Sequence, residues 1–303
     1  MILDVPTPDD FRNHGIDYLN IGWGTVLDIL ISLEDAGDFE TPEYLDEIRT
    51  NYWQAAEREL ATALSLIEQG AEFLLKGRIC AISPWLLITR NPVEWPRGAH
   101  NSDVNFSAFR TIDAQDLTRV HDTFSSQHLH EEFGRAFDYL RQRRNSIIHT
   151  VDRNMRFAAN ELIEQVLLVC EHLLDPQTWL KLRLEFLQRD RHTAIYPDGN
   201  EYRVAREFLA VVATLEPAKL KRFFDYNKRQ RSYLCPRCSI QDWDFGGKTA
   251  QLRPNSPASV NVHCFACGKD YQVVRERCQN SECRGNVHDE EDARCLTCSE
   301  YQE

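Results

Sequence analysis

The chain has 303 residues, of which 42% are hydrophobic and 27% charged, and its net charge is −12. This composition predicts a soluble globular protein large enough for two domains, and the negative charge argues against non-specific binding of nucleic acid over the whole surface. The first residues lack a basic segment followed by an apolar run, and no apolar run approaches the roughly 18 residues of a membrane span, so neither a signal peptide nor a membrane segment is expected.

Residues 10–230 are mostly helical in pattern and begin with two long helices. Apolar residues recur at helical spacing over residues 11–35. After an acidic loop, Thr41 and Pro42 form a strong helix start, because a hydroxyl can cap the first turn and proline fits its first position. The second helix is expected to extend from there to about residue 82.

The helical pattern breaks between residues 83 and 112, where three prolines and the polar run HNSDVN predict a long loop. A loop of this length in a compact domain is often functional. Further helices are expected over about residues 113–124, 129–149, 154–174 and 176–191, followed by two more that end near residue 230.

The helix expected at residues 129–149 leads into the stretch RQRRNSIIHT, residues 141–150. At about 100° per residue, its apolar side chains, Phe133 and Leu140 among them, form one stripe. Arg144 falls in the middle of that stripe. Burying an arginine alone is very costly, so Arg144 must be paired or must face a cleft or an interface.

Two interpretations of Arg144 follow from this position. The simplest is a structural salt bridge to a carboxylate such as Glu72 or Glu132. Asn145 and His149 fall together on a flanking face, so that His149 and Arg144 are too far apart around one helix to grip a single small group easily. A dimer that apposes two copies of this helix would instead gather both arginines and both histidines in one cleft.

The segment RNSIIH, residues 144–149, fits the R-x(4–6)-H motif of HEPN domains, including the polar residue directly after the arginine. The wider pattern also resembles HEPN domains, with a long helix carrying EFLLKG at 72–77, an irregular insertion, then the motif helix and one more. The resemblance covers about residues 10–175. It implies a mainly α fold, a HEPN-like helical bundle, whose function is that of a metal-independent endoribonuclease acting as a homodimer.

The resemblance implies a role for each residue of the motif. RNA cleavage through its own 2′-hydroxyl needs a base, an acid for the leaving 5′-oxygen and positive charge on the phosphorane. His149 is expected to act as general base or acid, Arg144 to clamp the phosphate and Asn145 to orient the phosphate or the imidazole. The expected products are a 2′,3′-cyclic phosphate and a 5′-hydroxyl. Glu72 and Lys76, four residues apart on the neighbouring helix, are candidate supporting partners for the motif, and a surface ion pair is the alternative.

Basic residues surround the motif and can bind the flanking phosphates of an RNA substrate. The alternative is a solvated face that aids solubility. The candidates for RNA binding are Arg141, Arg143, Arg153 and Arg156.

The ten cysteines are unevenly placed. Cys80 and Cys170 lie in apolar helical segments and are expected in the core. The other eight form four short pairs, CPRC, CFACG, CQNSEC and CLTC, between residues 235 and 298. Pairs of this kind indicate thiolates that bind metal in a reducing cytoplasm and not disulfides.

The four pairs predict two structural Zn²⁺ ions, because four thiolates give the closed tetrahedral site of structural zinc. The short strands SVNVH and DYQVV around the second pair favour a zinc ribbon. An interleaved, RING-like pairing of the cysteines is the alternative, and neither pairing leaves an open position for catalysis. Sequential pairing gives one site from Cys235, Cys238, Cys264 and Cys267 and a second from Cys278, Cys283, Cys295 and Cys298.

The composition changes after residue 232, which predicts three parts: a HEPN-like helical domain at 1–175, a helical extension with a basic linker at 176–231 and a small β-containing tandem zinc-ribbon domain at 232–303. Basic residues interleaved with aromatic ones near the linker suit single-stranded nucleic acid, and ribbon-core aromatics are the alternative. The aromatic residues are Tyr226, Tyr233, Trp243 and Phe265.

The acidic run DEED at 289–292 indicates that the second ribbon contacts a protein partner instead of RNA. Taken together, these features predict a cytoplasmic HEPN-type ribonuclease, homodimeric through its motif helix and fused to a double zinc ribbon, in the setting of a toxin or antiviral defence effector. Two alternatives are a non-catalytic RNA- or protein-binding scaffold and a regulatory subunit of a defence complex.

Overall fold

The computed structural model describes residues 1–37, 42–149, 156–174, 178–195, 199–238 and 247–302, without the side chains of residues 37, 42–48, 148, 149 and 192. The chain divides into two compact units, Met1–Asp175 and Pro176–Glu303, and each unit is described by itself. The described residues are mainly helical and include a small antiparallel sheet, as the sequence predicts.

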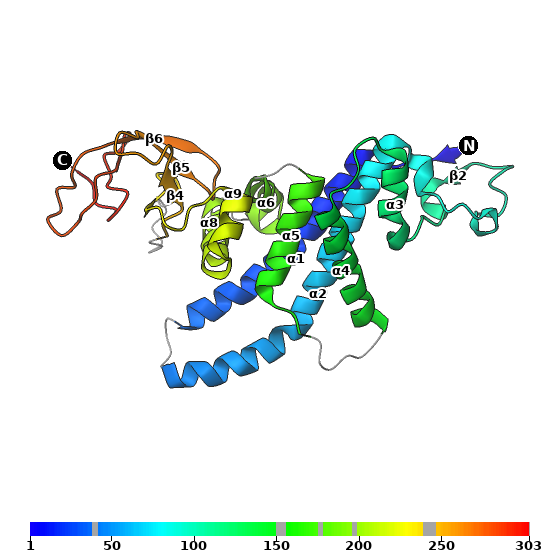
Figure 1. Ribbon diagram of the computed structural model, residues 1–303, viewed down its shortest axis with the longest axis horizontal. Coiled ribbons are helices and arrows are strands. Elements are labelled where there is room, and N and C mark those ends of the chain that lie inside the picture. Colours follow the sequence, from blue (N-terminus) through cyan, green and yellow to red (C-terminus); the bar gives the residue numbers. More distant parts are fainter. Residues whose placement is uncertain (38–41, 150–155, 175–177, 196–198, 239–246, 303) are drawn as a thin grey trace. The chain divides into compact units, whose positions relative to one another are not determined.

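Two long helices form the centre of the first unit. α1 (Pro8–Gly37) and α2 (Pro42–Ile82) run antiparallel along each other, as the blue and light-blue ribbons of Figure 1 show. α1 begins with reciprocal capping, because the Asp10 backbone N–H donates to Thr7 Oγ1 at 3.2 Å and the Thr7 backbone N–H donates to Asp10 Oδ2 at 2.8 Å. The start of α2 at Pro42 is where the sequence predicts it.

Three shorter helices, α3 (Ala114–Phe124), α4 (Glu131–His149) and α5 (Ala159–Leu173), complete the described α-helices of this unit. The predicted apolar stripe of α4 is confirmed, since Phe133, Phe137 and Leu140 are at most 1% exposed. Because α4 packs against α2 along this stripe, the residues that follow on the same face are brought toward α2.

Glycines let the two long helices approach closely. Gly15 of α1 and Gly70 of α2 face each other, and an added Cβ at Gly70 would lie 2.8 Å from Leu19 Cγ and 2.9 Å from the Gly15 carbonyl oxygen. The neighbouring side chains of Leu19, Trp23 and Ile67 are fully buried. The close approach therefore needs a residue without a side chain at both positions.

Replacement of Gly70 by alanine is expected to lower the free energy of unfolding of this unit by about 1–3 kcal/mol, because the helices must move apart to admit the methyl group. The matched control is Gly134→Ala in α4, where nothing in the described part of the chain outside the helix itself lies within 4 Å of an added Cβ. That change should stabilise the unit by roughly 0.5–1 kcal/mol. Urea unfolding followed by far-UV circular dichroism measures both, and equal effects would contradict the close-approach argument.

α1 differs from the sequence expectation in one respect. Among the described helices it is the one long and apolar enough to cross a membrane by length and composition. Half of the most apolar stretch of α1 is buried within the structure, as in the core helix of a soluble protein. The helix is therefore only a weak indication of a membrane span.

The predicted loop between α2 and α3 is ordered as short pieces of 3₁₀-helix, η1 (Pro84–Leu87), η2 (Pro92–Glu94) and η3 (Phe106–Ala108). The start of the chain fastens this loop. β1 (Ile2–Leu3) pairs in parallel with β2 (Val104–Asn105), and the N-terminal amine lies 2.6 Å from the Asp103 carboxylate. Residues 103–105 of the loop are therefore held by contacts with the N-terminal residues, in addition to the connections of the loop to α2 and α3.

The second unit begins, among its described residues, with the helices α6 (Trp179–Gln188), α7 (Arg191–Ile195), α8 (Asn200–Thr214) and α9 (Pro217–Phe224). A buried ion pair joins α6 to α8. Nε and Nη2 of Arg183 donate to the two carboxylate oxygens of Glu207 at 2.8 and 2.7 Å. Each charge thus has its partner in the low-dielectric interior, which burial requires.

An antiparallel sheet follows in the order β3-β4-β5-β6-β7. The predicted strands on either side of the second cysteine pair are present as β5 and β6. Gly268, between them, has a φ of +68°, a conformation that residues with a side chain rarely adopt. The strands are β3 (Ser232–Tyr233), β4 (Ala250–Leu252), β5 (Asn261–Cys264), β6 (Asp270–Val274) and β7 (His288–Asp289).

An aromatic cluster joins the helices of this unit to the sheet. Phe208 of α8 stacks on Phe265 with 5.5 Å between ring centroids, and Tyr226 meets the same ring edge-on at 5.1 Å. Tyr226, Tyr233 and Phe265 are between 4% and 6% exposed. These three are therefore core side chains, and the hypothesis that they stack on nucleic-acid bases is wrong for them. Trp243, the fourth residue of that hypothesis, lies outside the described residues.

Candidate functional site

Arg144 lies on the face of α4 that packs on α2, in line with the buried stripe. Its side chain is 24% exposed, whereas the side chain of Glu68 on α2 is 1% exposed. Nε and Nη2 of Arg144 donate to the two carboxylate oxygens of Glu68, at 3.1 and 3.3 Å. The arginine in the apolar stripe is therefore paired, and its partner is a buried carboxylate.

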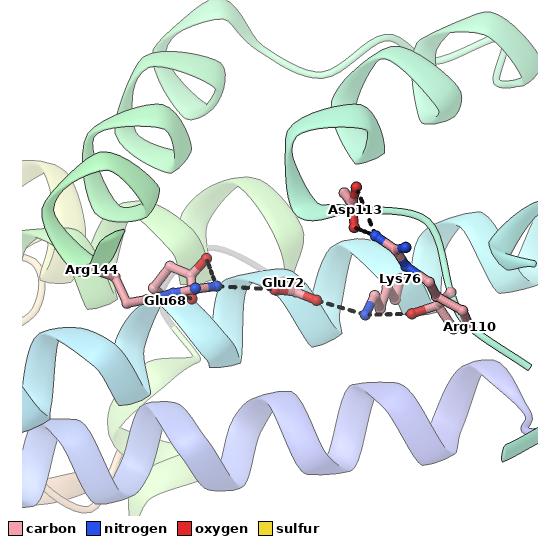
Figure 2. A network of polar contacts seen from close by, with 7 residues as sticks. Glu68, Glu72, Lys76, Arg110, Asp113 and Arg144 are labelled. Carbon is pink, nitrogen blue, oxygen red and sulfur yellow. Dashed lines mark hydrogen bonds and ion pairs between the residues drawn. The ribbon is translucent and has the colours of Figure 1, made fainter. Parts of the chain in front are cut away.

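The ion pair continues as a buried row of polar side chains along α2, which Figure 2 shows. Glu72 lies 4.0 Å from Arg144 Nη2 and 2.6 Å from Lys76 Nζ. Lys76 Nζ also donates to Thr111 Oγ1 at 3.3 Å. Glu68, Glu72 and Lys76 follow one another at intervals of four residues, so they share one face of α2. The row connects Arg144 to the end of the loop before α3.

Glu68 is the residue of this row that sequence reasoning missed. Glu72 and Lys76 were predicted as partners of the motif, and Glu68 lies one turn before Glu72 on the same helix face. That spacing is the signal that identifies it. Burial raises the pKa of Glu68, and the hydrogen bond and charge of Arg144 oppose part of this rise. The charged form of Glu68 therefore depends on Arg144.

Asn145 is in contact with Arg144, since its Oδ1 accepts a hydrogen bond from Arg144 Nη1 at 3.1 Å. The contact fixes one edge of the guanidinium on α4 itself. His149 is the last residue of α4, about one turn after Asn145. Its side chain lies outside the described part of the structure, so the predicted grouping of His149 with Arg144 stays a prediction.

Two of the arginines predicted to bind flanking phosphates are held by carboxylates. Arg141 is paired with Asp138 at 3.1 Å. Arg156 is paired with Glu57 at 3.6 Å. Arg153 lies outside the described residues. RNA binding by Arg141 or Arg156 therefore has to compete with an acidic neighbour.

Arg143 has a different environment. Its guanidinium lies over the ring of Phe157, 4.9 Å from the centroid, and donates to the backbone carbonyl oxygen of Arg156. A cation held over an aromatic face and bonded to backbone stabilises the local fold. Arg143 therefore fastens the end of α4 to the segment before α5.

The eight cysteines of the second unit form two groups of four, and the sequential pairing is the one observed. In each group the four Sγ atoms lie within 4.8 Å of one another, and two Sγ pairs of each group are separated by 3.7 to 3.9 Å. Disulfides are excluded by these separations, because a disulfide bond is about 2.05 Å long. Tetrahedral zinc with Zn–S bonds of about 2.3 Å places its sulfurs about 3.8 Å apart. Both groups therefore fit a structural metal ion such as zinc.

Hydroxyl groups reinforce the first cysteine group. Thr249 Oγ1 lies 3.3 Å from Cys264 Sγ, and the Tyr271 hydroxyl lies 3.3 Å from Cys267 Sγ. Donors beside the sulfurs stabilise thiolates and fix their orientation. A metal held by four thiolates has no open position for substrate, so its role is structural.

A third cluster of metal-binding side chains lies between the start of α4 and the end of α5. His130, Glu132 and His172 bring their ligand atoms within 4.8 Å of one another. The two imidazoles are stacked, with planes 11° apart and centroids 5.1 Å apart. Nitrogen lone pairs lie in the ring plane, so nearly parallel stacked rings do not point them at a common ion. This arrangement fits a stacked histidine pair whose His172 Nε2 meets Glu132 at 3.3 Å.

The chain matches no protein-family model, no curated protein and no solved structure at a significant level.

Proposed function

We propose that the first unit is a HEPN-type endoribonuclease that cleaves RNA without a catalytic metal. The observation that carries the proposal is the contact of Arg144 with Asn145 on the helix that ends at His149, with the guanidinium held by the buried carboxylate of Glu68. The order of the helices, with an irregular loop before the motif helix, supports the same proposal.

The environment of Arg144 suits the stabilisation of a transition state. Glu68 takes two of its N–H donors and Asn145 takes one, and a guanidinium has five. The remaining donors belong to a side chain that is 24% exposed, so a phosphate can reach them from solvent. Because the guanidinium is already fixed, little reorganisation is needed when charge develops on the phosphorane.

His149 acts in this proposal as general base for the 2′-hydroxyl or general acid for the leaving 5′-oxygen. Attack of the 2′-oxygen on phosphorus breaks the bond to the 5′-oxygen, which leaves a 2′,3′-cyclic phosphate and a 5′-hydroxyl. Asn145 orients the phosphate or the imidazole. Glu72 and Lys76 continue the buried row that positions Arg144 through Glu68.

The rest of the proposal concerns the setting. The enzyme is a homodimer that apposes two copies of α4. On one helix Arg144 and His149 lie too far apart around the axis to grip one small group. The dimer brings the arginine and the histidine of both copies into one cleft. The two tetra-cysteine ribbons hold zinc and recruit RNA or a protein partner. Thiolates that bind metal in place of forming disulfides suit a reducing cytoplasm, and the activity suits a toxin or antiviral defence effector.

The test compares RNA cleavage by the wild type, Arg144→Ala and His149→Ala in the presence of EDTA. Removal of a general acid or base is expected to lower the rate by about 10²- to 10⁴-fold. The matched control is Arg135→Ala, an exposed arginine of α4 paired with Glu131, which should retain activity. Mapping of the cut ends should find cyclic phosphates.

Metal content and circular dichroism must be measured on each variant, because EDTA can also strip the ribbons. Cleavage that persists in both variants would contradict the proposal, and so would the absence of cleavage by a folded, metal-loaded wild type.

The second candidate function is a non-catalytic scaffold for RNA or protein, or a regulatory subunit of a defence complex. The observation that favours it is the two-point contact of Arg144 with Glu68, because a purely structural ion pair has the same geometry. A wild type that binds RNA or a stoichiometric protein partner but cleaves nothing would support the scaffold.

A further inference from the structure

Two adjoining pockets open on the loop between α2 and α3. The aromatic pocket has a volume of about 620 Å³ and is lined by Trp85, Trp95 and Phe109. The polar pocket has a volume of about 490 Å³ and is lined mainly by charged side chains and threonines. Thr89 and Arg90 line both pockets. The two pockets therefore meet at Thr89 and Arg90, one pocket offering an aromatic wall and the other charged groups.

The aromatic pocket has an accessible wall in which Trp95 is held in place. The Trp95 indole N–H donates to the Thr89 carbonyl oxygen at 2.9 Å, and the Trp95 ring meets Phe109 edge-on with 6.3 Å between centroids. Trp85 and Trp95 are 51% and 44% exposed, although large apolar side chains normally avoid water. The held indole of Trp95 and the exposed indole of Trp85 are surfaces of the kind on which nucleic-acid bases stack.

Among the described residues, the arginines that line the polar pocket are paired with carboxylates, except Arg90, which lies where the two pockets meet. Arg110 is paired with Glu94 at 3.3 Å and with Asp113 at 3.1 Å, the second of which Figure 2 shows. Arg119 is paired with a carboxylate on its own helix at 2.6 Å. Arg90 is exposed and makes no ion pair among the residues that the structure describes. The pockets thus offer one uncommitted guanidinium, next to acidic groups that disfavour a chain of several phosphates.

We propose that the aromatic and polar pockets together bind one nucleotide, with its base against the aromatic wall and a single phosphate at Arg90. Aromatic faces hold a base by stacking, and an arginine fork matches phosphate oxygens. The chemistry is the same for a free nucleoside monophosphate and for one nucleotide within an RNA strand. This binding goes beyond the proposed RNA cleavage, since it uses neither Arg144 nor His149.

Isothermal titration calorimetry of the full-length, metal-loaded protein tests the proposal. The probes are AMP, UMP, adenosine, which lacks the phosphate, ribose 5-phosphate, which lacks the base, and a short single-stranded RNA that ends in hydroxyls. The variants are Trp85→Leu and Arg90→Gln. The matched controls are Trp53→Leu in α2 and Arg135→Gln in α4, neither of which lines the aromatic or the polar pocket. Folding of each variant is checked by circular dichroism.

Arg90→Gln is expected to weaken binding of the monophosphate about tenfold or more while adenosine binding stays unchanged, because only the phosphate loses its charged partner. Trp85→Leu is expected to weaken the monophosphate and adenosine alike, about fivefold to a hundredfold. The control variants should bind as the wild type does. Tight binding of AMP or UMP identifies a free nucleotide as the ligand, and binding of the RNA strand alone, with the same two sensitivities, identifies an RNA subsite.

Three results would overturn the proposal. The first is that neither the monophosphates nor the RNA strand bind. The second is that adenosine binds as tightly as AMP and Arg90→Gln has no effect. The third is that the control variants weaken binding as much as the pocket variants. Each result is independent of RNA cleavage, so failure of nucleotide binding and failure of the proposed nuclease activity are distinguishable.

Discussion

Replacing Cys295 by serine is expected to remove one metal ion from each chain and to unfold the segment around the second cysteine group. Binding of structural zinc contributes about 10–16 kcal/mol to the folding of small zinc domains. One buried cluster of this segment is formed by Cys278, Cys283 and Cys295 themselves, with Cys298 packed against them, so loss of the metal ion removes the centre of that cluster. The neighbouring strand β7 is 2 residues long, too short to be stable alone.

The same replacement of a cysteine by serine in the first cysteine group is expected to unfold less of the surrounding structure. Cys264→Ser should also remove one metal ion, but Phe265 keeps its contacts with Phe208 and Tyr226. Packing of these aromatic side chains retains part of the local structure. The difference between the two variants therefore separates what the metal contributes from what the aromatic cluster contributes.

Elemental analysis of metal content and limited proteolysis of the second unit measure both effects. The matched control is Cys170→Ala, since Cys170 is a buried cysteine of α5 outside both groups. It should keep two metal ions per chain. Two ions per chain in Cys295→Ser, or an undiminished resistance to protease after chelation, would refute a structural metal at the second group.

Replacing Arg144 by methionine is expected to lower the free energy of unfolding of the first unit by about 3–5 kcal/mol, because it strands a buried carboxylate without its partner. Glu68 has 1% of its side chain exposed. The 24% exposure of Arg144 lets some water reach the gap and favours the lower end of that range. The double variant Arg144→Met, Glu68→Leu removes both charges and should recover most of the loss.

The loss should also depend on pH. Burial raises the pKa of Glu68 above its usual 4.5, and Arg144 opposes the rise, so the pKa climbs further in Arg144→Met. A carboxyl with a raised pKa binds its proton more tightly when folded than when unfolded. The stability it confers is present below the unfolded pKa and is lost as pH increases through the folded pKa.

Denaturant unfolding of the single and double variants, repeated from acid to neutral pH, provides the measurement. The stability gap between them is expected to be small in acid and to widen toward neutral pH. A gap that stays constant with pH would show that Glu68 is not the group left stranded. The double variant also separates the two roles of Arg144, because a structural role predicts recovered function with recovered stability, whereas a phosphate clamp predicts a stable but inactive protein.

The sequence determined those features that depend on neighbouring residues. The helix start at Pro42 follows from a proline that fits the first position of a helix, whereas the predicted cap, Thr41, lies outside the described residues. The two groups of four cysteines that fit a metal ion follow from short spacings, and the apolar stripe of α4 follows from the helical repeat. The same stripe required a partner or a cleft for Arg144, because the cost of burying a lone charge does not depend on the fold around it.

The tertiary structure decided which groups meet over long distances. Glu68 is 76 residues from Arg144 in the chain, and only the packing of α4 on α2 brings it closer to the guanidinium than Glu72. Sequential and interleaved cysteine pairings contain the same residues, and the path of the strands selects between them. Tyr226 and Phe265 are as compatible with a surface as with a core until α8 covers them. In each case the local pattern states what a side chain requires, whereas the packing of distant elements determines which group supplies it.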